Sequence, residues 1–422
     1  MVVRMSLLFV GLSLITSQGL AAAAVIPIQC GELATLTKLD LTKKSDESLA
    51  LIEGLKAKVV GQDEAIQAVA ERIQIARGGM NAPGRPLGNI LFYGPTGVGK
   101  TKVPEALAEF LYGNPKALLK VDGAEFQQSH NIAKLIGSPP GYLGHGETVP
   151  LITQKSLDAH HTETTKISIL LFDEIEKANE SLWQLLLGML DKGVITLGDN
   201  TQVDLSNTLI FMTSNVGVEE MNKVVNKIGF NTQGEQGSSE ALEKIKDKNQ
   251  AVGSGALARK FPPEFLNRLD KKVLFNPLGT AQIEQILNIE LENVRQRALA
   301  NHRFMITLTP AMKRKLIKDG FSQEYGAREL KRVIDQLLVY NLATLASSGQ
   351  IKKDDVIIVD FDGKDVVFSS RPAPVTVQGA ADETDSNRII LTDLPEGIPA
   401  IHPAELPPAA PDGTLNLPFG SP

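Results

Sequence analysis

The chain has 422 residues, enough for two packed domains with additional segments and too long for one ordinary domain. Hydrophobic residues make up 42% and charged residues 22%, as is typical of a soluble globular protein, and a formal net charge of -6 offers no bulk positive charge for nucleic-acid phosphates. A nucleic-acid partner is therefore not expected, and the single cysteine, Cys30, excludes an intrachain disulfide framework.

Residues 1–24 have the pattern of a secretory signal. Arg4 is the charged residue, residues 7–15 are apolar, and residues 21–24 are alanines suited to cleavage. Polar residues after position 15 end the apolar run well short of the roughly 20 residues that a membrane-spanning helix needs. This segment predicts an exported protein, or else a mis-assigned start or an uncleaved membrane tether. Residues 25–48 follow as a linker.

Beyond the linker, helical periodicity alternates with short apolar runs. Apolar residues recur at three- and four-residue spacing over residues 49–78, which predicts helix. Four compact apolar runs end in polar residues or glycine, at residues 89–94, 117–123, 168–174 and 207–215. Such strands, separated by helical stretches, predict an α/β domain with a parallel sheet covered by helices, over residues 49–275.

The pattern changes at residue 276. Helices are expected at residues 280–300, 310–319 and 326–347, followed by a pair of strands near residues 354–361 and 364–370. This predicts a second, smaller and mostly helical domain over residues 276–370. From residue 371 to 422 prolines fall among Ala, Gly and acidic residues without periodicity, which predicts a disordered tail.

A glycine-rich loop follows the strand at 89–93 and precedes a helix, the context that a phosphate-binding loop requires. Glycines allow backbone N–H groups to turn toward phosphates, a lysine contacts the β and γ groups of ATP, and a threonine hydroxyl binds Mg²⁺. The residues expected to bind nucleotide are Gly94, Pro95, Thr96, Gly97, Val98, Gly99, Lys100 and Thr101.

The strand at 168–173 delivers two adjacent carboxylates at its polar end. We expect Asp173 to hold Mg²⁺ together with Thr101, and Glu174 to orient and polarise the attacking water. A strand that ends in Asp-Glu is common. Its position after the glycine-rich loop, at a spacing that suits neighbouring strands, favours a site for ATP hydrolysis.

With these motifs in place, the sequence resembles the Clp-type AAA+ ATPases, and in particular the second ATPase module of the Clp heat-shock unfoldases. The resemblance runs from about residue 61 to about residue 332, roughly two thirds of the chain. Its further motifs are GQD (61–63), GSPPGYLG (137–144), DEIEKA (173–178), FMTSN (211–215), FPPEFLNRLD (261–270) and YGARELKR (325–332).

The resemblance implies roles for three more residues. Asn215 is similar to the sensor that detects the γ-phosphate, and its amide can both donate and accept hydrogen bonds. Arg268 is similar to the finger that reaches the nucleotide of a neighbouring subunit, which implies a homo-oligomeric, hexameric ring. Arg328 is similar to the second sensor, which relates nucleotide state to the angle between the two domains.

The resemblance also implies protein partners. Tyr142 is similar to the pore-loop aromatic that grips unfolded or tagged substrate proteins, although the residues after it, including the insertion LDAHHTETTK, depart from the family pattern. Ile228, Gly229 and Phe230 match a tripeptide with which related unfoldases dock on a Clp peptidase; the alternative is that they fold back onto their own domain.

The expected function is thus an ATP-dependent protein unfoldase that threads polypeptide through a ring. The alternatives are a stand-alone remodelling chaperone without a peptidase, and a nucleotide-switched assembly protein that does not thread substrate. An ATP-hydrolysing enzyme belongs where ATP is present, so a cytosolic or cytosol-facing location is expected, with export through residues 1–24 as the alternative.

Overall fold

The computed structural model describes residues 40, 43–138, 149–218, 220–221, 239–321 and 326–372. The chain divides into two units, Met1–Lys44 and Ser45–Pro422, and every described helix and strand lies in the second. No helix within the described ranges is long and apolar enough to cross a membrane.

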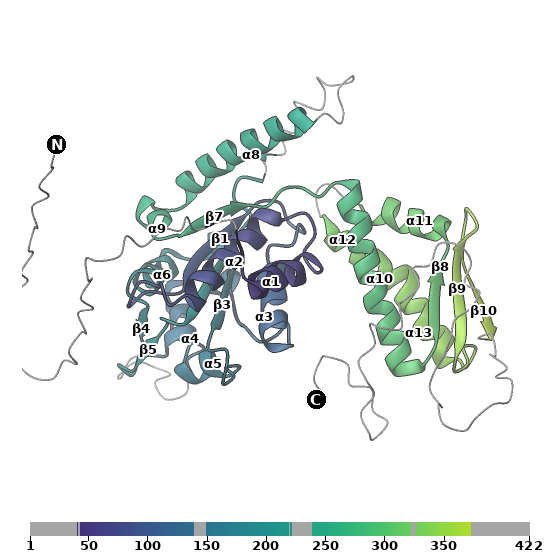
Figure 1. Ribbon diagram of the computed structural model, residues 1–422, viewed down its shortest axis with the longest axis horizontal. Coiled ribbons are helices and arrows are strands. Elements are labelled where there is room, and N and C mark those ends of the chain that lie inside the picture. Colours follow the sequence, from purple (N-terminus) through teal and green to yellow (C-terminus); the bar gives the residue numbers. More distant parts are fainter. Residues whose placement is uncertain are drawn as a thin grey trace, which may run out of the picture. The chain divides into compact units, whose positions relative to one another are not determined.

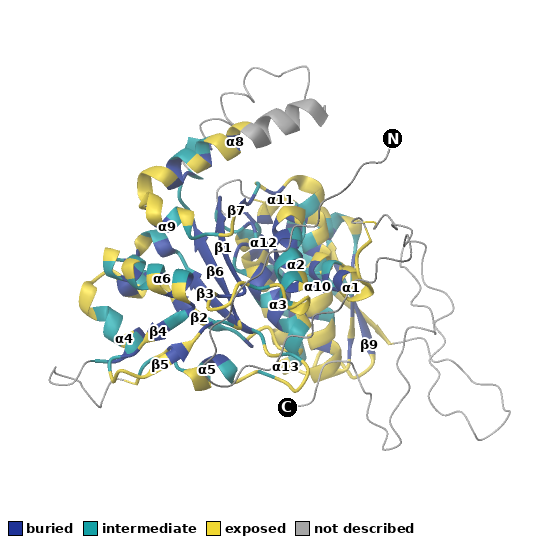
Figure 2. Ribbon diagram, turned by 60° about the vertical axis from the view of Figure 1, so that its left-hand side comes forward, coloured by how far each residue is buried: buried dark blue, intermediate teal, exposed yellow. Residues whose placement is uncertain are grey.

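The large domain, whose helices surround a central sheet in Figure 1, is built on a parallel sheet with five strands in the described part of the chain. The strand order is β2-β3-β6-β1-β7, and all five strands are labelled in Figure 2. Each neighbouring pair of strands runs in the same direction. The strands are β1 (Gly88–Tyr93), β2 (Leu119–Asp122), β3 (Ser168–Asp173), β6 (Thr208–Ser214) and β7 (Lys271–Leu274). This confirms the predicted parallel sheet covered by helices.

Alternate side chains of the central strands enter two separate cores, because successive residues of a strand point to opposite faces. In β1, Ile90 and Phe92 belong to one core, and Leu91 and Tyr93 to the other. Helices α1 (Asp46–Lys56), α2 (Asp63–Arg77) and α3 (Lys102–Tyr112) contribute to the first core. Helices α4 (Ala133–Ile136), α5 (Gln154–Asp158), α6 (Glu180–Lys192) and α9 (Pro263–Asn267) contribute to the second. Figure 2 shows the strands as a buried layer.

The remaining elements of the large domain are short or peripheral. A hairpin of β4 (Val194–Thr196) and β5 (Gln202–Asp204) follows α6, and 3₁₀ turns lie at Gly123–Phe126, Ser129–Ile132 and Ile175–Lys177. Helix α8 (Ser239–Lys260) precedes α9.

The small domain combines helices with a three-stranded sheet. Its helices are α10 (Thr280–His302), α11 (Pro310–Gly320), α12 (Ala327–Ile334) and α13 (Tyr340–Ser347), with one π-helical stretch, Asp335–Val339, between the last two. The sheet has the order β10-β9-β8, from β8 (Met305–Leu308), β9 (Asp355–Phe361) and β10 (Val366–Pro372). The expected helical small domain is confirmed.

Several details differ from the sequence expectations. The helical stretch at 49–78 is two helices, because Gly61 takes a φ of 75° between them. Helix α1 begins three residues before the expected boundary at 49, and β10 extends two residues beyond the expected one at 370. Strand β7 was not predicted, because Lys271 and Lys272 leave it only two apolar residues.

Candidate active site

Strand order brings the predicted site residues together. Because parallel strands end at the same edge of a sheet, the loops after β3, β6 and β1 are neighbours, in that order. The loop after β6 starts with Asn215 and therefore lies between the glycine-rich loop after β1 and the carboxylates after β3. One backbone hydrogen bond, from the N–H of Gly94 to the carbonyl of Ser214 (3.3 Å), ties the β1 and β6 ends directly.

The glycine-rich loop has a backbone that only glycine accommodates. Gly94 has a φ of 137°, and a Cβ there would lie 2.5 Å from the carbonyl oxygen of Phe275. Gly97 and Gly99 have φ of 71° and 103°, values that residues with a side chain rarely adopt. At Gly99 no atom lies within 4 Å of the place a Cβ would take, so the backbone conformation and not crowding favours glycine there. The loop leads directly into the N-terminus of α3, whose dipole favours anions.

Lys100 is buried in this loop with its three ammonium donors in use. Nζ donates to the carbonyls of Gly94 (2.7 Å) and Pro95 (2.6 Å) and to Oδ1 of Asn215 (2.8 Å). Burial lowers the pKa of Lys100 to about 8; the carboxylate of Glu176 acts to raise it, and the nearby charge of Arg328 lowers it further. The lysine is thus held beside the loop by contacts that an anion could replace.

Asp173 is the acceptor at the centre of the site. The hydroxyl of Thr101 donates to both of its oxygens (3.2 and 3.4 Å), Lys120 Nζ lies 2.8 Å from Oδ2, and the hydroxyl of Thr213 donates to Oδ1. Burial acts to raise the pKa of Asp173, but the hydrogen bonds from Lys120, Thr213 and Thr101 outweigh it, so the pKa lies below its ordinary value. The carboxyl is therefore ionised at neutral pH.

Glu174 is held in a strained backbone conformation. Its φ of 54° and ψ of 49° lie in the left-handed region, which costs a non-glycine residue about 1–3 kcal/mol. Its N–H donates to the hydroxyl of Thr213 (3.0 Å), and its side chain accepts from Asn215 Nδ2 (3.3 Å) and pairs with Lys177 (2.5 Å). The carboxylate thus contacts both Asn215 and Lys177.

Asn215 consequently joins the two halves of the site. Its Oδ1 accepts from Lys100 and its Nδ2 donates to Glu174, while its own N–H donates to Glu176 Oε1 (3.0 Å). A single amide thus connects the phosphate-loop lysine with the carboxylate expected to polarise water. Asn215 thus lies between Lys100 and Glu174.

The residues present fit a magnesium nucleotide. Mg²⁺ is usually held by one or two protein oxygen ligands, with phosphate oxygens and water completing the shell. The Thr101 hydroxyl and the ionised Asp173 carboxylate, in contact with each other, provide such a pair. No cluster of three or more His, Cys, Asp or Glu side chains in the described part of the chain could hold a metal ion by itself.

Two contacts bring the phosphate loop close to the second domain. The N–H of Ala327 donates to the carbonyl of Gly97 (3.0 Å), and a Cβ at Gly326 would lie 2.8 Å from the same oxygen. Arg328, the next residue of α12, is exposed, and its charge acts on Lys100. The position of Arg328 beside the loop is thus set by the tight approach of Gly326.

Gln62 makes a second bridge between the domains. This buried amide donates to the carbonyls of Val98 (3.3 Å) and Asn276 (3.1 Å) and accepts from the N–H of Asn276 (3.3 Å). It therefore connects the phosphate loop with the first residue expected for the small domain.

Arg268 is not brought to this site. It caps α9, and its carbonyl accepts from Asn89 at the amino end of β1, whereas the phosphate loop follows the carboxyl end of the same strand. About five residues of extended strand, roughly 16 Å, separate the two ends. The Arg268 side chain instead pairs with Asp191 (2.6 Å).

Some predicted residues lie outside the described part of the chain, namely Tyr142, Ile228, Gly229 and Phe230. Conversely, the sequence predicted no role for three polar residues of the site: Lys120 within β2, Glu176 just after β3 and Thr213 near the end of β6. Glu176 and Thr213 lie inside the motifs DEIEKA and FMTSN, whereas no sequence signal marks Lys120.

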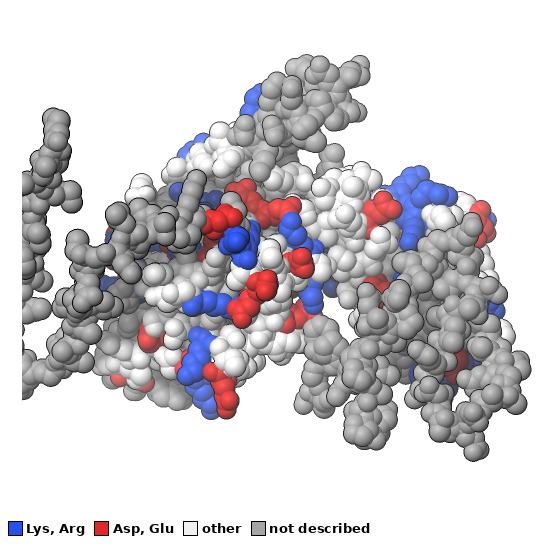
Figure 3. All heavy atoms as spheres, in the orientation of Figure 1, with Lys and Arg blue, Asp and Glu red and all other residues white. Residues whose placement is uncertain are grey.

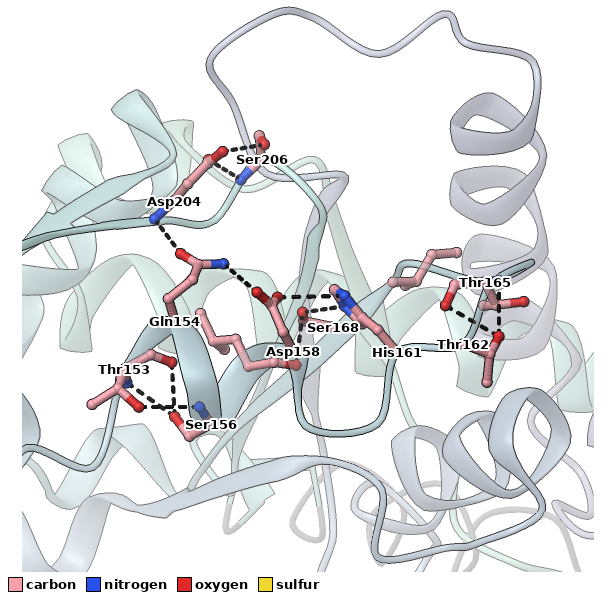
Figure 4. A network of polar contacts seen from close by, with 12 residues as sticks. Thr153, Gln154, Ser156, Asp158, His161, Thr162, Thr165, Ser168, Asp204 and Ser206 are labelled. Atoms are coloured by element: carbon pink, nitrogen blue, oxygen red, sulfur yellow. Dashed lines mark hydrogen bonds and ion pairs between the residues drawn. The ribbon is translucent and has the colours of Figure 1, made fainter.

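Asp158, His161 and Ser168 form a second polar cluster that resembles a hydrolase triad in composition (Figure 4). His161 lies 3.4 Å from Asp158 through Nδ1 and 2.9 Å from the Ser168 hydroxyl through Nε2. Ser168 is only 4% exposed, however, and its hydroxyl donates to the carbonyl of Leu157 (3.0 Å). A buried hydroxyl engaged in this way is no nucleophile. The cluster closes the segment between α5 and β3 instead.

Comparison with known families agrees with this geometry. Residues 85–272 match the model of an AAA domain of the Cdc48 subfamily. Residues 278–359 match the model of the C-terminal, D2-small domain of ClpB protein. The chain belongs to the Clp-type AAA+ ATPases and corresponds to their second ATPase module. The two matches follow one another in the order in which that module carries its domains, which confirms the resemblance drawn from the motifs.

Individual relatives give the same assignment. The chain is 37% identical over 323 residues to an ATP-dependent Clp protease ATP-binding subunit ClpA homolog, chloroplastic, of Brassica napus, covering 76% of this chain and 35% of that protein. It is 38% identical over 326 residues to the mitochondrial chaperone protein ClpB3 of Oryza sativa subsp. japonica, covering 76% and 31%. The chain thus spans about a third of the length of these relatives.

Solved structures of Hsp104 share the fold. An extended-conformation complex of S. cerevisiae Hsp104 with casein matches with a TM-score of 0.64 and 29% identity over 77% of this chain and 53% of that one. A closed state of Hsp104 with ATPγS and FITC casein matches with a TM-score of 0.62 and 30% identity, over 78% and 53%.

Proposed function

We propose that this chain hydrolyses ATP and uses the energy to unfold proteins as one subunit of a ring. The observation that carries the proposal is the hydrogen-bonded line from Lys100 through Asn215 to Glu174. It joins a group suited to bind the γ-phosphate with a group suited to polarise water, as hydrolysis at phosphorus requires.

The residues of this hydrogen-bonded line, and the predicted site residues outside it, each have a proposed role. Lys100 and the loop N–H groups bind the phosphates, and Thr101 and Asp173 hold Mg²⁺, which neutralises charge on the phosphates when bound. Glu174 orients the water and Asn215 reports the γ-phosphate. Arg268 acts on the nucleotide of a neighbouring subunit, and Arg328 acts from the small domain, whose boundary with the large domain we place between residues 275 and 276.

The proposed substrate is protein rather than nucleic acid. Two solved structures of Hsp104 contain casein, and the net charge of this chain is -6. Over the large domain in Figure 3, Lys and Arg lie among Asp and Glu. We further propose that six copies form the ring, that Tyr142 grips substrate in its pore, and that Ile228, Gly229 and Phe230 dock on a Clp peptidase. A cytosol-facing location suits an enzyme that needs ATP, and export through residues 1–24 is the alternative.

The test starts with purified full-length chain, Mg²⁺, ATP and a stably folded, tagged substrate protein. The wild-type chain is expected to turn over ATP and to unfold the substrate, measured as loss of the substrate's fluorescence. Both activities are expected to be abolished in Glu174→Gln, although this variant still binds ATP. Tyr142→Ala is expected to retain basal turnover and lose unfolding. Retained unfolding in Tyr142→Ala would refute the threading role, and turnover without unfolding in the wild type would favour the nucleotide-switched assembly protein.

The peptidase partner needs a separate measurement. A double variant, Ile228→Ser with Phe230→Ser, is expected to unfold substrate at the normal rate and to lose degradation by an added Clp peptidase. If the wild-type chain supports no degradation at all, the stand-alone remodelling chaperone is the better description.

A further inference from the structure

Arg268 lies among polar side chains at the amino end of β1, remote from the phosphate loop. Its guanidinium pairs with Asp191 on α6 and is still about one third exposed, with a side-chain exposure of 36%. Among the described residues it has no second acceptor. One face of the guanidinium is therefore held, and the other donors are available to an anion outside the chain.

The backbone on both sides of this ion pair is tied together by one buried amide. Asn89 is 5% exposed, and its Nδ2 donates to the carbonyl of Leu190 (3.2 Å) and to the carbonyl of Arg268 (3.3 Å). Its N–H donates to Asp270 (2.8 Å). Since Leu190 precedes Asp191, both partners of the ion pair are fixed by their main chains as well as by their side chains.

The carboxylate of Asp191 occupies an electrostatically unfavourable position, which its ion pair with Arg268 offsets. It lies in the last turn of α6, where the helix dipole disfavours a carboxylate. Two arginines offset this, because Arg85 Nη2 also lies 3.2 Å from the Asp191 oxygen that Arg268 contacts. The side chain of Arg85 is more exposed than that of Arg268 and lies farther from the Asp191 oxygen, so Arg268 is the principal partner of Asp191.

We infer that Asp191 is a positioning residue for Arg268: it restrains the guanidinium in the orientation in which a neighbouring subunit's nucleotide meets it. An unrestrained arginine would lose rotamer freedom at the moment of reaction, and the ion pair removes that freedom in advance. This inference rests on the proposed function, because it concerns hydrolysis between subunits.

The first test is steady-state ATP hydrolysis by Asp191→Asn, which keeps the shape and removes the charge. We expect kcat to fall about tenfold, a small part of the 10³-fold or more that a finger arginine contributes, with KM for ATP changed less than about twofold. Arg85→Gln is the matched control, since it leaves the Arg268–Asp191 pair intact, and it is expected to behave as wild type. Asp191→Glu retains the charge and is expected to recover most of kcat.

The second test separates an effect on the neighbour from damage to the chain itself. Asp191→Asn subunits have an intact nucleotide site, and Glu174→Gln subunits have an intact Arg268. When the two kinds of subunit are mixed in equal amounts, the ATP hydrolysis rate of the mixture is expected to exceed the average of the rates of the two separate proteins about fivefold. The reason is that half of the Asp191→Asn sites then face a correctly held arginine. Arg268→Ala mixed with Glu174→Gln is the reference for such complementation.

Three results would overturn the inference. If Asp191→Asn has wild-type kcat, the restraint has no role. If Arg268→Ala complements and Asp191→Asn does not, Asp191 supports only its own subunit. If Arg268→Ala itself keeps full activity, the finger role in the proposed function fails first and the inference falls with it. Thermal melts and gel filtration of each variant accompany the assays, and Asp191→Ser replaces Asp191→Asn if the latter does not assemble.

Discussion

Nucleotide binding should be coupled to protonation of Lys100. Burial lowers the pKa of this lysine to about 8 in the nucleotide-free chain, so about half of the molecules carry a neutral amine at pH 8 and about nine in ten at pH 9. The phosphates of ATP replace neutral carbonyl acceptors with negative charge and hold the ammonium protonated. Because the complex then binds more protons than the free chain, raising the pH favours the free chain.

The size of the effect follows from the pKa. ATP binding is expected to take up about 0.5 proton at pH 8 and about 0.9 proton at pH 9, and the affinity is expected to fall about fivefold between these two values. Titration calorimetry of Glu174→Gln, which cannot turn ATP over, in two buffers of different ionisation enthalpy measures the uptake. Lys102→Gln is the matched control, because Lys102 is exposed and adjacent to the loop. Tight ATP binding without proton uptake between pH 8 and 9.5 would refute the reasoning.

The same lysine affects folding stability with a defined sign. Its pKa is lowered from 10.5 to about 8, so between these pH values the unfolded chain binds more protons than the folded one. The free energy of unfolding of the nucleotide-free chain should therefore rise with pH across this window, by about 3 kcal/mol from this group alone. Urea titrations of wild type and Lys100→Met at pH 8 and 10 measure the difference. Equal pH dependence in the two proteins would contradict it.

Three further substitutions test single residues. Gln62→Ala leaves backbone groups of Val98 and Asn276 without partners and should lower the free energy of unfolding by about 2–4 kcal/mol in urea titrations, and Gln62→Glu should be at least as destabilising because a carboxylate cannot donate to the two carbonyls; a loss below about 0.5 kcal/mol would show that the bridge is unimportant. Thr213→Val removes the hydroxyl that contacts both Asp173 and the N–H of Glu174, and should lower kcat about 10- to 100-fold with rescue by Thr213→Ser; unchanged kcat would contradict this role. Ser168→Ala should cost about 1–2 kcal/mol of stability and leave ATP hydrolysis within twofold, whereas lost hydrolysis at unchanged stability would point to chemistry at this cluster.

The phosphate loop and the carboxylates could be predicted because their signal is local. Glycines, a lysine and a hydroxyl between a strand and a helix fix the backbone of residues 94–101 over eight positions, and Asp173 ends an apolar run. The relation between them is not local. That β6 pairs with both β1 and β3 decides that Asn215 lies between Lys100 and Glu174, and no periodicity within a single strand encodes it.

Two contacts that could not be predicted join residues far apart in the chain. Gln62 meets Asn276 across 214 positions, and Asn89 meets Arg268 across 179. Each is a buried amide that satisfies backbone groups of another segment, and although Gln62 lies in the GQD motif, the sequence does not show which segment either amide contacts. Strand β7 was missed for a related reason, because its two lysines lie at an edge of the sheet, where one side of the strand needs no apolar neighbour.

Strand β1 keeps two of the predicted site residues, Lys100 and Arg268, apart within one chain. Its carboxyl end leads into the loop that holds Lys100, and its amino end carries the Asn89 amide that fixes Arg268. A straight strand cannot bring its two ends together, so the arginine and the phosphate loop of one chain stay apart whatever the side chains do. Two copies placed side by side, with the amino end of one β1 facing the carboxyl end of the next, would join them. Hydrolysis that depends on Arg268 would then depend on assembly, and Asp191 would be the residue through which each subunit prepares its neighbour's site.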